Sequence, residues 1–166
     1  FVMDKQDFSL EKFRTGGLFE NIMPGIEPVC VRHGAGLHVD MEEEEIAVEF
    51  DLFKTMVLNI IDNSVKAECS DIWVRGKKGQ ECYEVSFQDN GKGIPPEEID
   101  RITEAFYMVD KSRSRKQHGA GLGMALVARI AQIHRARLKV ESDGRSGTTV
   151  RITFNLPEGG RNEQNV

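Results

Sequence analysis

The sequence predicts an α/β (α+β) fold, a two-layer sandwich in which helices pack against a sheet. Stretches with helical spacing and stretches with alternating polar and apolar residues occur within one chain of 166 residues. These stretches do not follow the steady β-α-β alternation of a doubly wound parallel sheet. The length fits one domain with a substantial core, and no internal repeat is evident.

The first half of the chain is expected to alternate short strands with two helices. Pro24 and Pro28 lie inside the first helical pattern, which continues on both sides of them. Four consecutive glutamates, residues 42–45, are expected to form a solvated turn. The predicted elements are a strand over 8–13, a helix over 17–32, strands over 36–41 and 46–50, and a helix from its N-cap Asp51 to Glu68.

The second half is expected to contain two pairs of strands, two helices and a long loop. The first turn of the short helix is rich in prolines and acids, which suit a helix start. The polar tail after Pro157 is expected to be disordered. The predicted elements are strands over 71–76 and 82–88, a short helix over 94–102, a loop over 103–118, a helix with Leu122, Leu126, Ile130 and Ile133 on one stripe, and a hairpin of 137–142 with 148–156.

Composition and charge restrict the partners. The net charge of −5 argues against nucleic acid or an anionic membrane as the main partner. No apolar run approaches the roughly 20 residues of a membrane helix, and no signal peptide is evident. Three scattered cysteines favour a reducing compartment, buried positions and no metal site. Because the sequence starts without an initiator Met, we expect a piece of a longer protein, which could carry a membrane anchor elsewhere.

The helix over 51–68 has one apolar side and one polar line. The apolar side contains Phe53, Met56, Val57, Ile60 and Ser64. Asn59, Asn63 and Lys66 are spaced i, i+4, i+7 and so lie in line, with Asp62 at the edge. Two amides and an ammonium in line can serve oxygen ligands, a hydrated Mg²⁺ and phosphate charge, but they also fit a solvated helix face.

The segment Asp89–Ile94, "DNGKGI", follows an alternating strand directly. Its Asn-Gly and Lys-Gly pairs indicate a tight turn with positive φ. Asp89 ends the strand and could accept a hydrogen bond from an exocyclic amine. A hairpin-like turn with an Asx cap is the alternative.

The long loop is basic, and a glycine-rich stretch follows it. Lys111, Arg113, Arg115 and Lys116 could close over a polyphosphate, or the loop could be merely solvated. The glycines of "HGAGLGMALV", at 119, 121 and 123, allow close backbone approach at a helix N-terminus, where N–H groups are free. This stretch lacks the P-loop pattern and does not follow a strand as a Rossmann fingerprint does.

In combination, these segments resemble the histidine-kinase branch of the GHKL ATPases, the Bergerat fold. "LNIIDNSVKA" is similar to the N box, "DNGKGI" to the G1 box, "EAFYMVDKSRSR" to the F box and lid, and "GAGLGMALV" to the G2 box. The resemblance covers about residues 8–157. It implies a mixed, mostly antiparallel sheet packed against about three helices, with a long ATP lid at about 95–118. Residues 1–7 would end an upstream linker or dimerisation domain, and 158–166 would be the disordered tail.

The resemblance also implies roles for individual residues. Asn63 would coordinate a Mg²⁺ that bridges the phosphates, supported by Asn59, and Lys66 would neutralise phosphate charge. Asp89 would bind the adenine amine, with help from Thr148 through a water. The remaining nucleotide contacts implied are Gly91, Gly93 and Ile94 around the base, lid candidates Lys111, Arg113 and Arg115, and Gly119, Gly121, Leu122 and Gly123 at the phosphates.

Two positions depart from the family pattern. Ala67 replaces the aromatic residue that usually follows the N-box lysine, and Ala120 replaces the usual Thr of the G2 box. The first change puts a contact to the nucleotide in doubt, and the second removes a hydroxyl. We expect neither to abolish ATP binding.

The resemblance implies an ATP-dependent protein histidine kinase from which the phosphoacceptor is missing. None of the four histidines has the acidic and basic neighbours of a phosphoacceptor histidine, and His134 suits a structural role at a helix end. The implied partners are a histidine-bearing dimerisation domain of the same protein, which would make the parent a homodimer, and a response regulator. A cytoplasmic location is implied, and Asp62 would orient or deprotonate the incoming imidazole.

Two alternatives share this fold. A serine kinase of the anti-sigma type is disfavoured by the amino-acid sequence of the lid segment, "FYMVDKSRSR". A regulatory nucleotide-binding module without phosphotransfer is left open by Ala67 and Ala120, although the intact boxes disfavour it.

Overall fold

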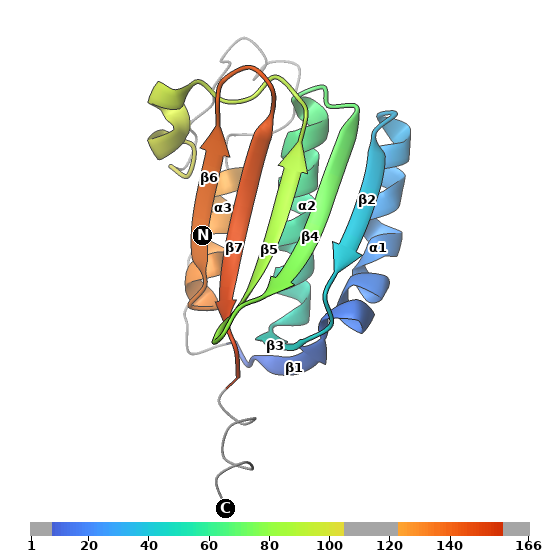
Figure 1. Cartoon of the computed structure of the whole chain (residues 1–166), viewed down its shortest axis with the longest axis vertical. Helices are drawn as coiled ribbons and strands as arrows, with labels where there is room; N and C mark the ends of the chain where they lie inside the picture. Colours follow the sequence, from blue (N-terminus) through green and yellow to red (C-terminus); the bar gives the residue numbers. More distant parts are fainter. Residues whose placement is uncertain (1–7, 105–122, 158–166) are drawn as a thin grey trace, which may run out of the picture.

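The computed structural model describes residues 8–104 and 123–157, which form two layers (Figure 1). A five-stranded sheet has the order β2-β4-β5-β7-β6, and the helices lie against one of its faces. This arrangement confirms the predicted two-layer α/β sandwich. The strands of the sheet are β2 (Gly36–Met41), β4 (Asp71–Lys78), β5 (Cys82–Asp89), β6 (Arg137–Ser142) and β7 (Thr148–Asn155).

The sheet is mixed and mostly antiparallel. Among the strands that the structure describes, only β2 and β4 pair in parallel, because the long helix α2 (Phe50–Lys66) carries the chain back between them. The other three pairings are antiparallel, and two of them come from the predicted hairpins. In the β5–β7 pairing Asp89 lies opposite Thr148, which brings the end of β5 to the start of β7.

Within residues 8–104 and 123–157, three helices cover the inner face of the sheet, in agreement with the sequence. They are α1 (Thr15–Arg32), α2 and α3 (Gly123–Ile133). Helix α1 runs through Pro24 and Pro28, which lie four residues apart on its exposed side. On that side water can satisfy the carbonyl groups that the prolines leave without an N–H partner.

The buried face of α2 agrees with the predicted apolar side. All five predicted residues, Phe53, Met56, Val57, Ile60 and Ser64, are buried, together with Ile61 and Val65. They pack against inward side chains of the sheet such as Val85, Phe87 and Ile152. On α3 the buried residues include Val127, Ile130 and Ile133, while Leu126 is half-buried and Leu122 lies outside the described residues.

The predicted N-cap of α2 was wrong by two residues. The helix begins at Phe50, and the Glu49 carboxylate accepts the hydrogen bond from the Leu52 N–H at 2.7 Å. Asp51 therefore lies in the first turn, exposed to solvent. The earlier start lets Phe50 pack against Phe13, with ring centroids 6.0 Å apart.

Two short strands, β1 (Glu11–Arg14) and β3 (Glu45–Val48), form a separate antiparallel pair. Both differ from the predicted ranges, since β1 starts three residues later than expected and β3 ends two residues earlier. Because Arg14 is followed at once by α1, this pair fixes the point at which the first helix starts.

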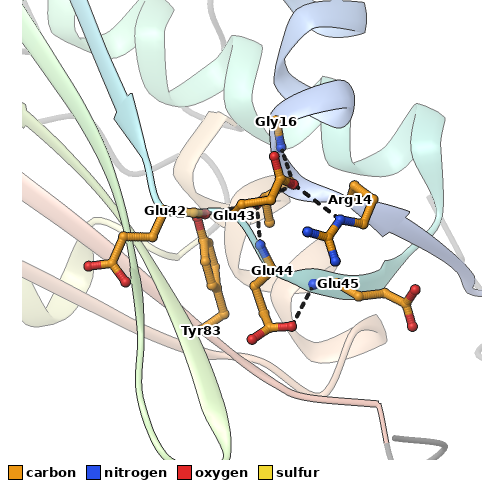
Figure 2. A network of polar contacts seen from close by, with 8 residues as sticks. Arg14, Gly16, Glu42, Glu43, Glu44, Glu45 and Tyr83 are labelled. Carbon is orange, nitrogen blue, oxygen red and sulfur yellow. Dashed lines mark hydrogen bonds and ion pairs between the residues drawn. The ribbon is translucent and has the colours of Figure 1, made fainter.

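The acidic segment 42–45 has more structure than the solvated turn that the sequence predicted (Figure 2). The Glu43 carboxylate accepts a hydrogen bond from the Gly16 N–H at 3.1 Å and lies 3.5 Å from the Arg14 guanidinium. Its negative charge therefore faces the N-terminus of α1, where it stabilises the helix dipole.

The backbone of this segment is held from two further elements. The Glu42 carbonyl accepts hydrogen bonds from the Tyr83 hydroxyl at 2.6 Å and from the Thr15 hydroxyl at 2.9 Å. Tyr83 is fully buried in the core and belongs to β5. The acids thus link the β1–β3 pair to the main sheet, and the prediction of a merely solvated turn was wrong in this respect.

The remaining elements follow the prediction where the structure describes them. The short helix is a 3-10 helix, η2 (Pro96–Arg101). Cys30 and Cys69 are buried, as expected, and Cys82 is half-buried. Residues 1–7, 105–122 and 158–166 lie outside the described residues, so the predicted long loop from residue 105 on and the predicted disordered tail are not described. Among the described helices none is long and apolar enough to cross a membrane.

Candidate nucleotide-binding site

The polar line predicted on α2 exists, and its members are half-buried. The Asn59 amide donates to the Thr55 carbonyl at 2.8 Å, which fixes the orientation of its side chain along the helix. Lys66 Nζ lies 2.8 Å from Asp62 Oδ2, one turn earlier. Asp62 and Lys66 are therefore an ion pair in this structure. Asn63 lies between Asn59 and Lys66 along the helix.

The first residue of α3 faces the two asparagines. A Cβ atom at Gly123 would lie 3.5 Å from Asn59 Oδ1 and 3.5 Å from Asn63 Oδ1. Figure 1 shows α2 and α3 side by side against the sheet, and the two helices are in direct contact. The structure thus brings Gly123 of the glycine-rich stretch to the polar line of α2, although 64 positions separate Asn59 from Gly123 in the sequence.

Asp89 is the buried carboxylate of the site, with an exposed fraction of 6%. Its Oδ2 accepts a hydrogen bond from the Ser64 hydroxyl at 2.7 Å. Its Oδ1 accepts from the Gly91 N–H at 2.9 Å and from the Thr148 N–H at 3.3 Å. These three donors fix the carboxylate in a single orientation.

A carboxylate has about four acceptor positions, and three of them are used here. The remaining position is on Oδ2, since Oδ1 already accepts two hydrogen bonds. An exocyclic amine of a ligand could donate there. Asp89 is therefore arranged to recognise a donor group rather than an acceptor.

The sequence did not predict the role of Ser64 in the site. Its position on the apolar side of α2 is nevertheless an indication of such a role. A buried hydroxyl needs a hydrogen-bond partner, and a serine among Met56, Ile60 and Ile61 must find one in the layer below. The partner could not be named because Asp89 is 25 residues away.

The turn after β5 packs closely against the end of α2. A Cβ atom at Gly91 would lie 2.6 Å from the Ala67 carbonyl oxygen, so no larger residue fits without a shift. The Lys92 N–H donates to the same carbonyl at 3.0 Å. Ala67, which departs from the family pattern, therefore lies directly against the glycine of this turn.

The far end of the turn is attached to the hairpin of β6 and β7. Gly93 has φ +78°, the left-handed conformation that the sequence predicted and that glycine adopts without strain. Gly91 does not have a positive φ, so the prediction was wrong for the Asn-Gly pair, where glycine is needed for its close contact with Ala67 instead. The Ile94 N–H donates to the Ser142 hydroxyl at 2.8 Å, and that hydroxyl donates to the Gly147 carbonyl at 2.6 Å. Ser142 was not singled out in the sequence, where a serine at a strand end has no distinctive signal.

Cys69 is near the site but does not offer a nucleophile. Burial raises the pKa of its thiol to about 11, and the charge of Asp89 adds to this effect. The thiol is therefore protonated at neutral pH, and a thiolate would be the reactive form. Among the described residues, no group of three or more His, Cys, Asp or Glu side chains could hold a metal ion.

Several predicted site residues lie outside the described residues. These are Lys111, Arg113, Arg115, Gly119, Gly121 and Leu122. The described members fall into two groups at one end of the helical layer. Asn59, Asn63, Lys66 and Gly123 form one group, and Asp89, Gly91, Gly93, Ile94 and Thr148 form the other. Helix α2 connects the two groups, since it carries both Asn63 and Ser64.

The class of protein is that of the GHKL ATPases, which the match to a family model shows. The sequence model of one protein family, the histidine kinase-, DNA gyrase B- and HSP90-like ATPases, matches residues 48–158 of this chain. These residues are more than half of the chain. The chain belongs to this ATPase family.

Similar proteins include bacterial sensor kinases. The signal transduction histidine-protein kinase ArlS of Staphylococcus aureus (strain USA300) is 38% identical over 114 residues, which cover 66% of this chain. The aligned part is 25% of the length of ArlS, so the chain spans about a quarter of this relative.

Solved structures support the same fold. The mycobacterial sensor histidine kinase MprB has a TM-score of 0.73 at 23% identity, over 90% of this chain and 99% of that chain. Full-length ShkA in complex with AMPPNP has a TM-score of 0.76 at 22% identity, over 90% of this chain and 32% of that chain. The catalytic domain of histidine kinase ThkA has a TM-score of 0.75 at 16% identity, over 89% of this chain and 96% of that chain.

Proposed function

We propose that this chain is the catalytic, ATP-binding domain of a sensor histidine kinase in a two-component system. It would bind Mg-ATP and transfer the γ-phosphoryl group to a histidine on a separate dimerisation domain. The observation that carries this proposal is that Gly123 lies against Asn59 and Asn63, while Ser64, the residue directly after Asn63, donates a hydrogen bond to Asp89. A single helix thus presents groups for both ends of a nucleotide.

The base end would be read by Asp89. Adenine carries an exocyclic amine, and the free acceptor position on Asp89 Oδ2 suits it. Thr148 already orients the carboxylate through its backbone N–H, and a water between its side chain and the base would complete the contact. Guanine presents a carbonyl oxygen at the corresponding ring position, and a carboxylate would repel it.

The phosphate end would be held by α2 and the start of α3. The Asn63 side-chain oxygen, half-buried and close to Asn59, is the type of ligand that Mg²⁺ accepts. The donor set therefore fits a hydrated Mg²⁺ bound by Asn63 and by phosphate oxygens. When bound, the ion would neutralise phosphate charge. Gly123 at the start of α3 places backbone N–H groups and the positive end of a helix dipole near the same point.

Transfer would depend on positioning and charge neutralisation more than on covalent chemistry by this chain. Lys66 would neutralise phosphate charge, and Asp62 would orient or deprotonate the imidazole that attacks. The 2.8 Å ion pair between them would then open when nucleotide binds, because Lys66 would gain phosphate oxygens as partners. We propose that Lys111, Arg113 and Arg115 belong to the lid and that Gly119, Gly121 and Leu122 contribute backbone contacts to the phosphates.

The parent protein would contain further domains. A histidine-bearing dimerisation domain would make it a homodimer, and a response regulator receiver domain would accept the phosphoryl group. We place the ATP-binding domain at residues 8–157, with the end of an upstream linker or dimerisation domain at 1–7 and a tail at 158–166. A cytoplasmic location would suit a domain that consumes ATP.

A nucleotide-binding regulatory module without phosphotransfer is the second candidate, favoured by the small Ala67 at the site. One experiment separates it from a kinase. The chain is mixed with a separately produced dimerisation domain of a histidine kinase and with ATP labelled at the γ-phosphate. Label on histidine, lost on acid treatment, supports the kinase. ATP binding without transfer supports the module, acid-stable label on serine would indicate a serine kinase, and absence of ATP binding would refute all three.

A further inference from the structure

The side chain of Asn90 connects the turn after β5 to the segment after α2. Asn90 Oδ1 accepts hydrogen bonds from the Ser70 N–H at 2.9 Å and from the Asp71 N–H at 3.0 Å. Its Nδ2 donates to the Ser70 hydroxyl at 2.8 Å. One carboxamide thus makes three hydrogen bonds to two consecutive residues, across a sequence separation of about 20.

The position of Asn90 gives these bonds a consequence for the site. It directly follows Asp89, whose carboxylate is arranged to recognise the base, and directly precedes Gly91, which packs on Ala67. The Lys92 N–H adds a second attachment to Ala67. The turn is therefore fixed on both sides to residues 67–71, which come straight after the helix that carries Asn63.

The segment to which Asn90 attaches is itself fixed to the sheet. The Ser70 hydroxyl donates to Asp71 Oδ2 at 2.8 Å, and His38 Nε2 lies 2.8 Å from Asp71 Oδ1. The hydrogen bonds from His38 and from Ser70 lower the pKa of Asp71, so its carboxylate stays ionised at neutral pH. The Ser70 carbonyl in turn accepts from the Gly36 N–H of the edge strand β2 at 2.8 Å. Asn90 is thus held by a segment with little freedom to move.

We propose that Asn90 is a positioning residue for base recognition, which sets the place of Asp89 relative to α2 and thereby supports the preference for ATP over GTP. This inference rests on the proposed function. Asn90 does not touch the base. Its loss would let Asp89 shift, so that the carboxylate would meet the adenine amine less well, whereas guanine, which has no amine at that ring position, would have no such contact to lose.

The test compares dissociation constants for Mg-ATP and Mg-GTP in the wild type and in Asn90→Ala. We expect Asn90→Ala to weaken ATP binding by about tenfold and to change GTP binding little, so that the ATP-to-GTP preference falls by about the same factor. Asn90→Asp keeps an oxygen that accepts from Ser70 and Asp71 N–H, and it should regain most of the preference. Gln88→Ala is the matched control, since this amide bonds Arg75 on the outer face of the sheet and should leave the preference unchanged.

The ratio of the dissociation constants for Mg-ATP and Mg-GTP distinguishes a positioning role of Asn90 from a role in the stability of the fold alone. If Asn90→Ala melts at a lower temperature but keeps the wild-type ratio, Asn90 is only structural and the inference is wrong. If Asn90→Ala does not fold, Ser70→Ala is measured in its place. Ser70→Ala should lower the ATP-to-GTP preference by about threefold, and an unchanged preference would overturn the inference. A wild type that binds neither nucleotide would instead refute the proposed function and, with it, this inference.

Discussion

His134 connects the last turn of α3 to the first turn of α2. Its Nε2 accepts a hydrogen bond from the Glu49 N–H at 3.0 Å, and its Nδ1 lies 2.8 Å from the Ile130 carbonyl oxygen. Because a backbone N–H can only donate and a carbonyl can only accept, the ring must be neutral with its proton on Nδ1. The Phe154 ring packs against it perpendicularly, with ring centroids 6.1 Å apart. The structural role expected for His134 is thus confirmed.

This neutral histidine predicts a pH dependence of stability. Burial lowers the pKa of His134, although the Ile130 carbonyl and the Glu49 charge oppose the shift. The unfolded chain therefore takes up a proton more readily than the folded one. The contribution of His134 is complete above the ordinary histidine pKa of about 6.5 and is lost as pH falls below it.

The check is chemical denaturation between pH 8 and pH 5. The free energy of unfolding should fall below about pH 6.5 in the wild type, and His134→Gln should flatten that fall. His33→Gln removes an exposed histidine and should keep the wild-type slope. Equal slopes in all three proteins would contradict this reading of the His134 contacts.

The Ser64 hydroxyl predicts an effect on both stability and nucleotide binding. Ser64→Ala removes one donor from the buried Asp89 carboxylate but leaves the Gly91 and Thr148 N–H groups in place. We expect a loss of about 1–2 kcal/mol in stability and about fivefold weaker ATP binding, measured by denaturation and by calorimetry.

Ser86→Ala is the control for this prediction, because Ser86 lies on the same strand as Asp89 but on its outer face. It should change neither quantity appreciably. If the two alanine variants behave alike, the Ser64–Asp89 hydrogen bond has no part in nucleotide recognition.

At the scale of single elements, the start of α2 shows why helix ends are hard to predict. Asp51 has the residue type of a good N-cap, but the helix starts earlier because Phe50 packs on Phe13. That contact joins residues 37 positions apart, so no local pattern contains it. Glu49 is a less common cap residue, and the structure uses it because the chain turns into the helix there.

Two substitutions test this cap. Glu49→Ala removes the acceptor for the Leu52 N–H and should cost about 1 kcal/mol of stability, whereas Asp51→Ala should cost only a few tenths through the helix dipole. Thermal or urea denaturation measures both. A larger loss of stability in Asp51→Ala than in Glu49→Ala would show that Asp51 is the N-cap, as the sequence predicted.

Gly91 supplies a prediction for the turn as an element. In Gly91→Ala the new Cβ would meet the Ala67 carbonyl oxygen at 2.6 Å, so the turn must move away from α2 and Asp89 must move with it. We expect ATP affinity to fall by tenfold or more, measured by calorimetry.

A helical glycine offers the matched control. Gly17→Ala adds a Cβ in α1 where nothing lies within 4 Å, and it should leave ATP binding intact while raising stability by up to about 1 kcal/mol. Normal affinity in Gly91→Ala would show that the close contact with Ala67 is not needed by the site.

At the scale of the whole molecule, the sequence predicted the layers, the helices and most strand positions. The predicted sides of α2 agree with burial almost residue by residue, because helical spacing is a local property. The hairpins could be predicted for the same reason. The pairing of β2 with β4 and of β1 with β3 could not, since each joins segments from opposite sides of a helix.

The candidate site divides in the same way. Asn59, Asn63 and Asp89 could be selected from patterns of residue type and from the family resemblance. Their supports, Ser64, Asn90 and Ser142, could not be selected, because each acts through a partner at least 5 residues away that only the folded chain brings near. Sequence patterns thus predict the side chains proposed to contact a ligand more readily than they predict the side chains that hold those groups in position.

In the proposed function, α2 and the start of α3 hold the Mg²⁺ and phosphates of ATP while Asp89 holds the base. Calorimetric titration of ATP into the wild type, Asn63→Ala and Asn21→Ala, each with Mg²⁺ and with chelator, tests this arrangement. Asn21 is exposed on α1 and serves as the control. We predict that Asn63→Ala loses at least about tenfold in affinity with Mg²⁺ and much less with chelator, while Asn21→Ala matches the wild type. Equal affinities of Asn63→Ala and the wild type in Mg²⁺ would contradict this arrangement.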